Sequence, residues 1–197
     1  MGYFITILSG LFLFAHLSAQ SNYDIYINEF LASNVSVNAD IVDFDDYSDW
    51  IELYNNENFE VDIGGYFITD NPNNPYRWEF PEETHIKAKS FLRIWADSYN
   101  NRPGKHPVRP WPNYCHMSEP NIYFETDYYH LNFNLSRAGE YIGLYAPDGF
   151  IVDSVSFDLQ YRDISMGRQP DGSTYWFYFG EPTPEASNNT VGVPVPK

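Results

Sequence analysis

The sequence contains a single cysteine, Cys115, among 197 residues. One cysteine excludes an internal disulfide framework and any zinc cluster built from cysteines alone. Basic residues are also scarce, because 11 Lys plus Arg stand against 27 Asp plus Glu and leave a net charge of −16. Nucleic-acid affinity comes largely from Lys and Arg that displace counterions from phosphates. We therefore expect no nucleic-acid partner.

Long apolar runs are missing as well. After the N-terminal segment no stretch approaches the roughly 18 apolar residues of a membrane-spanning helix, so we expect no transmembrane segment in the mature chain. What the chain has in excess is aromatic residues, 17 Tyr, 15 Phe and 5 Trp, which make up 19% of the sequence. A disordered acidic chain lacks such large apolar groups. The composition therefore indicates one folded domain with a full hydrophobic core.

The first twenty residues differ from the rest, because they contain no Asp, Glu, Lys or Arg. Residues 3–17 are mostly apolar and have the length of a signal-peptide core, and Ser18-Ala19 supplies a small-residue cleavage site. A buried strand or a short membrane anchor is the alternative interpretation of this stretch. We predict a signal peptide at residues 1–19 and a secreted or extracytoplasmic protein, in the periplasm or at the cell surface.

The mature chain shows the pattern of short strands. Runs of β-branched and aromatic residues recur between clusters of Asn, Asp, Gly and Pro. They predict strands at residues 25–31, 50–54, 66–69, 77–80, 91–96, 131–135, 141–145, 150–157, 165–168 and 175–179. Pro-Asp-Gly at 147–149 and at 170–172 predicts two tight turns. No segment shows helical periodicity over three turns. The pattern predicts an all-β fold, an antiparallel β-sandwich.

Three segments fall outside this pattern. Residues 34–48 form an acidic loop, and residues 99–129 form a long insertion rich in Pro and aromatics. Residues 182–197 are rich in Pro and Asn without a clear pattern, and we interpret them as the end of a closing strand followed by a linker. Loops of this length inside a compact domain are usually functional or disordered. We predict one domain at residues 22–188, with the insertion at 99–129 and a C-terminal tail at 189–197.

Several short motifs occur in an order that resembles a known family. They are Ile27-Asn28-Glu29-Phe30-Leu31-Ala32-Ser33-Asn34, Asp49-Trp50-Ile51-Glu52-Leu53-Tyr54-Asn55, Gly64-Gly65-Tyr66-Phe67-Ile68-Thr69-Asp70, Leu92-Arg93-Ile94-Trp95-Ala96-Asp97, His130-Leu131-Asn132-Phe133-Asn134-Leu135-Ser136, Asp148-Gly149-Phe150-Ile151-Val152-Asp153, Gly167-Arg168-Gln169-Pro170-Asp171-Gly172-Ser173 and Pro182-Thr183-Pro184. This series resembles the lamin-tail domain family, in particular its bacterial secreted form. The resemblance implies an immunoglobulin-like sandwich and an accessory or anchoring role.

Strand alternation suggests a buried charge pair. If residues two apart share a face, Glu29 lies on the side of Ile25 and Ile27, and Asp153 lies on the side of Val155 and Phe157. A buried carboxylate needs a partner, and the planar guanidinium of Arg168 can bind one bidentately. We predict a structural pair between Arg168 and Glu29 or Asp153, which holds the last hairpin against the sandwich. A catalytic pair of these acids is the alternative.

Two groups of residues in the sequence are candidate metal sites. The acidic loop offers Asp43, Asp45, Asp46 and Asp49 as calcium ligands, since hard cations prefer oxygen, although the spacing does not match an EF-hand. A solvated acidic loop is the competing interpretation. The cluster His106, Cys115, His116 and His130 matches no zinc signature. Cys115 is either a buried thiol or a cross-link to another chain.

Motifs for nucleophilic catalysis and for phosphate binding are absent from the sequence. Trp50, Trp78, Trp95 and Trp176 lie in or beside predicted strands, so at least three of them should pack in the core or between the sheets. The sequence therefore predicts a secreted, non-catalytic binding, scaffolding or anchoring module, without a required cofactor, whose partner is a protein or a cell-envelope polysaccharide. The alternatives are a carbohydrate- or calcium-binding accessory module and a small metal-dependent hydrolase.

Overall fold

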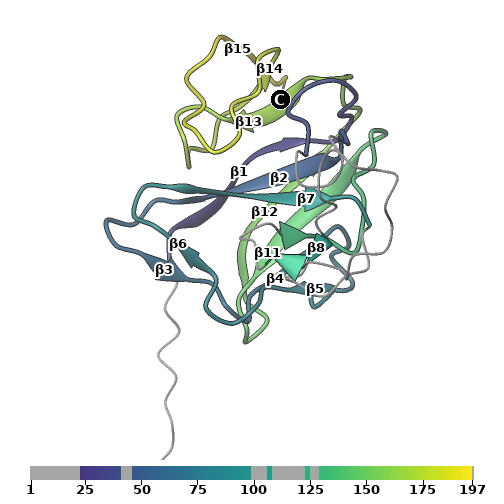
Figure 1. Cartoon of the computed structure of the whole chain (residues 1–197). Helices are drawn as coiled ribbons and strands as arrows, with labels where there is room; N and C mark the ends of the chain where they lie inside the picture. The colour runs from purple at the N-terminus through teal and green to yellow at the C-terminus, as the bar shows by residue number, and fades with distance from the viewer. Residues whose placement is uncertain (1–22, 41–45, 99–105, 108–122, 125–128, 197) are drawn as a thin grey trace, which may run out of the picture.

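The computed structural model of the chain describes residues 23–40, 46–98, 106–107, 123–124 and 129–196 (Figure 1). In these residues the chain forms strands, turns and loops, and no helix. Accordingly, none of the described segments is a helix long and apolar enough to cross a membrane. The predicted signal peptide and most of the predicted insertion, including Cys115, lie outside the described residues.

Seven strands form the larger sheet. Their order is β10 (Tyr129–His130), β7 (Phe91–Ala96), β2 (Asp49–Asn55), β1 (Ile25–Leu31), β13 (Ser165–Arg168), β14 (Trp176–Phe179) and β15 (Gly192–Pro194). Neighbours in this sheet run antiparallel, except β10 and β7, which are parallel.

Four strands form the second sheet, in the order β12 (Ile151–Phe157), β11 (Glu140–Tyr145), β4 (Phe67–Thr69) and β5 (Trp78–Glu79). Two further pairs are β3 (Val61–Asp62) with β6 (His85–Ile86), and β8 (His106–Pro107) with β9 (Tyr123–Phe124). The two main sheets form separate layers, one on each side of a shared core (Figure 1). The predicted all-β, immunoglobulin-like sandwich is confirmed.

The core lies between the inner faces of the two sheets. Alternation along β2 shows how it is built, because Ile51 and Leu53 belong to the core while Trp50 and Glu52 point to the other side. Phe30 of β1 meets Phe157 of β12 with ring centroids 4.5 Å apart, so aromatic packing joins the layers. We call the side of the larger sheet that faces away from this core its outer face.

A β-bulge in β1 reverses the predicted orientation of Glu29. The pairing of β1 with β2 shifts between Ile27 and Glu29, so one extra residue enters the strand there. Ile27 and Phe30 therefore both point into the core, whereas Leu31 packs with Trp50 on the outer face. Glu29 shares the outer face with Leu31, and the prediction that it faces the core was wrong.

Several segments differ from the strand prediction, and the short strands β3, β6, β8, β9 and β10 lie outside all of the predicted ranges. Residues 131–135 alternate as predicted, with Leu131 and Phe133 buried, but they form no strand. Their backbone makes separate contacts to the end of β7 and the residues after it: the Leu131 N–H donates to the Trp95 carbonyl, and Asn134 forms an isolated bridge with Asp97. A strand pattern in the side chains therefore did not produce continuous backbone pairing. The stretch after Pro182, interpreted as a closing strand end followed by a linker, contains β15 near its C-terminal end, where it pairs with β14 and forms an edge of the larger sheet.

Candidate functional site

Arg168 stands at the end of β13 and lies close to both sheets. Its Nη2 lies 3.0 and 2.9 Å from the two carboxylate oxygens of Asp153, which comes from β12 of the smaller sheet. Its Nε donates to the carbonyl oxygen of Ile27 at 2.9 Å, and its Nη1 donates to the carbonyl oxygen of Ser173. Of the two acids predicted as partners of Arg168, Asp153 is in contact with it.

The pair also satisfies an open stretch of β1. The backbone N–H of Ile27 donates to Asp153 Oδ2 at 2.8 Å, while its carbonyl accepts from Arg168. β13 pairs with β1 at Glu29 and Phe30 but not at Ile27. The side chains of Asp153 and Arg168 therefore supply the hydrogen bonds to the backbone of Ile27 on that side of β1. Burial raises the pKa of Asp153, and the guanidinium of Arg168 and the two backbone donors counteract it.

Two rings enclose the Arg168 guanidinium. Its Cζ lies 4.5 Å from the centroid of the Trp176 ring and 5.5 Å from that of Tyr26. Cation–π contact of this kind stabilises a desolvated guanidinium, which is 7% exposed here as a side chain. Trp78 lies in the core and Trp176 is partly buried against it, whereas Trp50 and Trp95 are buried with Leu31 on the outer face of the larger sheet. The prediction that at least three of the four tryptophans pack in the core or between the sheets was therefore wrong.

Glu29 is not in the Arg168 pair, because the bulge places it on the outer face. Its carboxylate accepts from Ser165 Oγ, from the backbone N–H of Thr183 at 3.2 Å and from Thr183 Oγ1 at 3.0 Å. Gly167 lies opposite Glu29 on β13, and a Cβ there would stand 3.0 Å from Glu29 Cγ. The absence of a side chain at Gly167 therefore makes room for Glu29.

Glu52 is the direct cross-strand neighbour of Glu29, on β2. Both carboxylates are fully buried. The Oε2 of Glu52 accepts the backbone N–H of Glu185, while its Oε1 has no hydrogen-bond partner in the described part of the chain. Burial raises the pKa of both groups, that of Glu52 well above its usual range, and the nearby Glu29 charge raises the pKa of Glu52 further.

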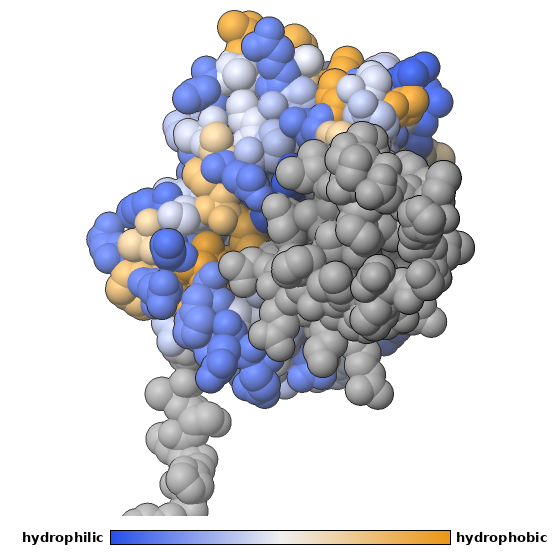
Figure 2. Space-filling view, in the orientation of Figure 1, coloured by the Kyte–Doolittle hydropathy of each residue, from blue (hydrophilic) through white to orange (hydrophobic). Residues whose placement is uncertain are grey.

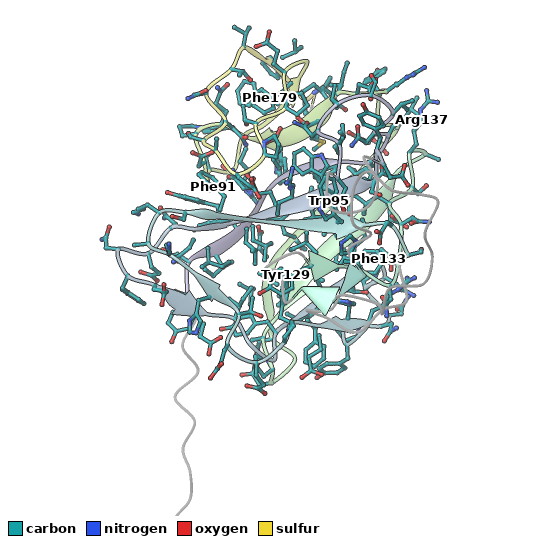
Figure 3. All side chains as sticks on the ribbon, viewed as in Figure 1. Phe91, Trp95, Tyr129, Phe133, Arg137 and Phe179 are labelled. Atoms are coloured by element: carbon teal, nitrogen blue, oxygen red, sulfur yellow. The ribbon has the colours of Figure 1, made fainter. Side chains whose placement is uncertain are left out.

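The groups that cover this pair come from the connection between β14 and β15, residues 180–191, which we call the strap. Asn188 of the strap is buried and donates to the carbonyl oxygens of Asn28, at 3.2 Å, and Arg168, at 2.9 Å. Its backbone N–H donates to Asp171 Oδ1 at 3.0 Å. Figure 3 labels Phe179, after which the strap begins, in the upper part of the view, with Phe91 and Trp95 of β7 below it. Because Thr183 binds Glu29 of β1 and Glu185 binds Glu52 of β2, the strap returns across the outer face of the sheet.

The four calcium candidates are only partly described. Asp43 and Asp45 lie outside the described residues. Asp46 Oδ1 accepts the backbone N–H of Tyr47, and Asp49 Oδ1 accepts that of Asn34, both at 2.8 Å. Burial raises the pKa of Asp49 to about 6. Asp46 and Asp49 are thus both engaged by backbone, and no group of three or more His, Cys, Asp or Glu within the described ranges is arranged to hold a metal.

His130 forms a buried contact that the sequence did not indicate. Its Nδ1 lies 2.6 Å from Asp97 Oδ2, and its Nε2 lies 3.7 Å from Asp40 Oδ2. The sequence groups His130 only with His106, Cys115 and His116. The side chain of His106 and all of Cys115 and His116 lie outside the description. Asp97 directly follows β7 and lies 33 residues before His130, so no local sequence pattern relates the two.

Aromatic residues also lie on the outer side of the smaller sheet. The ring of Tyr141 lies over Gly143, where a Cβ would stand 2.7 Å from ring atom Cε1. Its hydroxyl lies 2.9 Å from that of Tyr145, whose cross-strand neighbour is Phe67. Tyr76 packs edge-on against Phe67 with centroids 4.9 Å apart and is 51% exposed. These four rings form one patch.

Hydrophilic and apolar residues occupy different parts of the visible face. In the coloured part of this face, Figure 2 shows many hydrophilic residues, with apolar residues at the upper edge, where β14 and β15 lie, and in a second area at the left of the view. At the upper edge Val191 is 92% and Val193 is 64% exposed.

The comparisons with known proteins identify a family. The model of the Lamin Tail Domain matches residues 18–158. A comparison with curated proteins found no match. The family match ends just after β12, so β13, β14, the strap and β15 complete the larger sheet beyond it.

Proposed function

Because the chain belongs to the lamin tail domain family, we propose that it is a non-catalytic immunoglobulin-like interaction module. It acts outside the cytoplasm as a binding, scaffolding or anchoring unit, and its partner is a protein or a cell-envelope polysaccharide. The proposal rests most directly on how the acids suspected of catalysis are used. Asp153 binds Arg168 and the backbone of Ile27, and Glu29 and Glu52 lie fully buried beneath the strap.

Such groups stabilise a scaffold rather than meet a substrate. A carboxylate that performs general acid or base catalysis must come within hydrogen-bond reach of a reacting group. Full burial of Glu29 and Glu52 beneath the strap keeps both from such contact. The surface that remains for a partner is acidic on average, with a net charge of −16, and this favours partners other than nucleic acid.

The experiment is a capture assay with the chain beginning at Gln20, immobilised and exposed to extracytoplasmic extract. Specific retention of one protein or envelope polymer is the expected result, and fractionation of cells should place the protein outside the cytoplasm. Turnover of a hydrolase substrate that Glu52→Gln abolishes would contradict the non-catalytic role. Melting temperatures measured with and without calcium, for wild type and for Asp45→Ala, test the acidic loop. A calcium-dependent gain in melting temperature that the variant loses would identify calcium binding.

A second candidate function is glycan binding, and the aromatic patch on the smaller sheet favours it. Tyr141 is packed against Gly143 and its hydroxyl lies beside that of Tyr145, while Tyr76, which packs against Phe67 of the same patch, is 51% exposed. Sugars stack on exposed aromatic rings through their apolar C–H surfaces. A glycan array read with wild type and with Tyr76→Ala tests it, and equal binding by both proteins would remove the patch from consideration.

A further inference from the structure

Two carboxylates that form no salt bridge in the described part of the chain lie on neighbouring strands beneath the strap. Glu29 of β1 and Glu52 of β2 are cross-strand neighbours and are both fully buried. Arg93 is the next residue in this row, on β7, but its Nη2 lies 3.5 Å from Glu185 Oε1 and its Cζ lies 4.4 Å from the Trp95 ring centroid. Within the described residues, no Lys or Arg forms a salt bridge with either carboxylate.

The other charged groups around the pair do not neutralise it. Asp171, in the turn after β13, adds a negative field that raises the pKa of both Glu29 and Glu52. Glu185 of the strap is exposed at its side chain and is directed to Arg93. Two ionised carboxylates in a dry site repel one another strongly, because the low local dielectric does not screen them. The pair is therefore stable in the closed structure when it holds a proton.

The strap depends on these same oxygens. The backbone N–H and Oγ1 of Thr183 donate to Glu29, and the backbone N–H of Glu185 donates to Glu52. Asn188 anchors the far end of the strap to Asn28 and to Arg168. Water can reach the carboxylates only when the middle of the strap, near Thr183 and Glu185, moves away from the sheet.

We infer that the strap is a pH-sensitive latch, closed over the outer face of β1 and β2 while the Glu29–Glu52 pair holds a proton. Ionisation of both carboxylates opens it, because the repulsion between them is relieved when water enters. Opening uncovers a polar row on the sheet that the closed form hides. The inference concerns the strap and its two carboxylates and does not depend on which partner the module binds.

The test is native-state hydrogen exchange, measured by NMR on the whole chain and corrected for the intrinsic exchange rate. Consider the pH range between the pKa of the pair when the strap is open and its higher pKa when the strap is closed. In this range the opening constant reported by the amides of Thr183 and Glu185 should rise about tenfold per pH unit, since one proton is released on opening. The amide of Ser136 donates to Glu140 Oε2 at 2.9 Å and serves as an internal reference, because the pKa of Glu140 is also raised by burial away from the strap.

Two variants separate the latch from a general effect of pH. Glu52→Gln should remove the pH dependence at Thr183 and Glu185 and keep both protected, whereas Glu140→Gln should leave it unchanged. If Glu52→Gln does not fold, the wild-type carboxyl ¹³C resonance of Glu52 decides, because it should titrate where the strap amides lose protection. Protection that does not vary with pH, that varies equally in Glu52→Gln, or that is lost far from that titration would overturn the latch.

Discussion

The Arg168 guanidinium binds both carboxylate oxygens of Asp153, with Nη2 at 3.0 and 2.9 Å, and this contact joins the two sheets of the sandwich. Arg168 also donates to the carbonyl oxygen of Ile27, and Asp153 accepts the N–H of Ile27. The pair thus continues the bonding of β1 beyond the point where β13 stops pairing with it. Its contribution is geometric as well as electrostatic.

Asp153→Asn should destabilise the protein by about 3–5 kcal/mol, because it leaves the buried guanidinium of Arg168 without its counter-charge. Chemical denaturation by urea measures the loss. Asp158→Asn is the matched control, since Asp158 is exposed just beyond the same strand and should change stability by less than about 0.5 kcal/mol. Similar losses in the two variants would contradict the structural role of the pair.

Stability should fall as pH rises through the acidic range into neutral. Burial raises the folded-state pKa of Glu29 and Glu52, so the native state binds protons more tightly than the unfolded chain. Their stabilisation is fully present below the unfolded pKa and is lost as pH approaches the folded values. Melting temperature measured across this range checks the direction, and a curve that rises with pH would contradict it.

Glu52→Gln should increase stability at neutral pH by about 1.4 kcal/mol for each unit of pKa shift that it removes. The amide keeps an acceptor for the Glu185 N–H but carries no charge beside Glu29. The gain should disappear in acid, where Glu52 is already protonated. Denaturation of both proteins at two pH values measures this, and a gain that is equal at both would disprove the charge explanation.

Gly167→Ala should cost about 1–3 kcal/mol through overpacking. Its Cβ would stand 2.6 Å from Asn188 Nδ2 and 3.0 Å from both the Asn28 carbonyl oxygen and Glu29 Cγ. Gly180→Ala is the control, because a Cβ there meets no atom within 4 Å. Thermal melts compare the two, and equal effects would mean that strap packing over Gly167 is unimportant.

Replacing Pro194 and Pro196 together by Val should promote self-association. Val195 donates its N–H to the Trp176 carbonyl, so the backbone groups at Pro194 point away from β14, to the free edge of β15. Proline has no N–H to offer another strand, and such edges resist strand addition. Light scattering over a range of concentrations measures the effect. Wild type and the double variant remaining equally monomeric would show that the prolines do not protect this edge.

Much of the fold could be predicted from the sequence, because strands and turns depend on local patterns. The ranges 25–31, 91–96 and 165–168 coincide with β1, β7 and β13. Pro-Asp-Gly at 147–149 forms the expected turn, with Gly149 at φ +85° and its N–H bonded to the Ala146 carbonyl. Asp153 also lies on the side of Val155 and Phe157, as alternation required.

The candidate site was less predictable, since its members meet through long-range contacts. One bulged residue in β1 moved Glu29 from the core side to the outer face, and nothing in residues 25–31 marks that insertion. Glu52 could have been recognised from alternation in β2, where it shares a side with Trp50. Its neighbour Glu29, and the return of residues 183–188 across the sheet, had no local signal.

The sequence by itself determined the strand content, the acidic charge and the family, because periodicity, composition and ordered motifs are properties of neighbouring residues. Only the tertiary structure decided what the charges contact. It paired Arg168 with Asp153 rather than Glu29, and it brought two acids together beneath the strap. The physical reason is that burial and sheet register set the partners and the pKa of each group, and both arise only when distant segments pack.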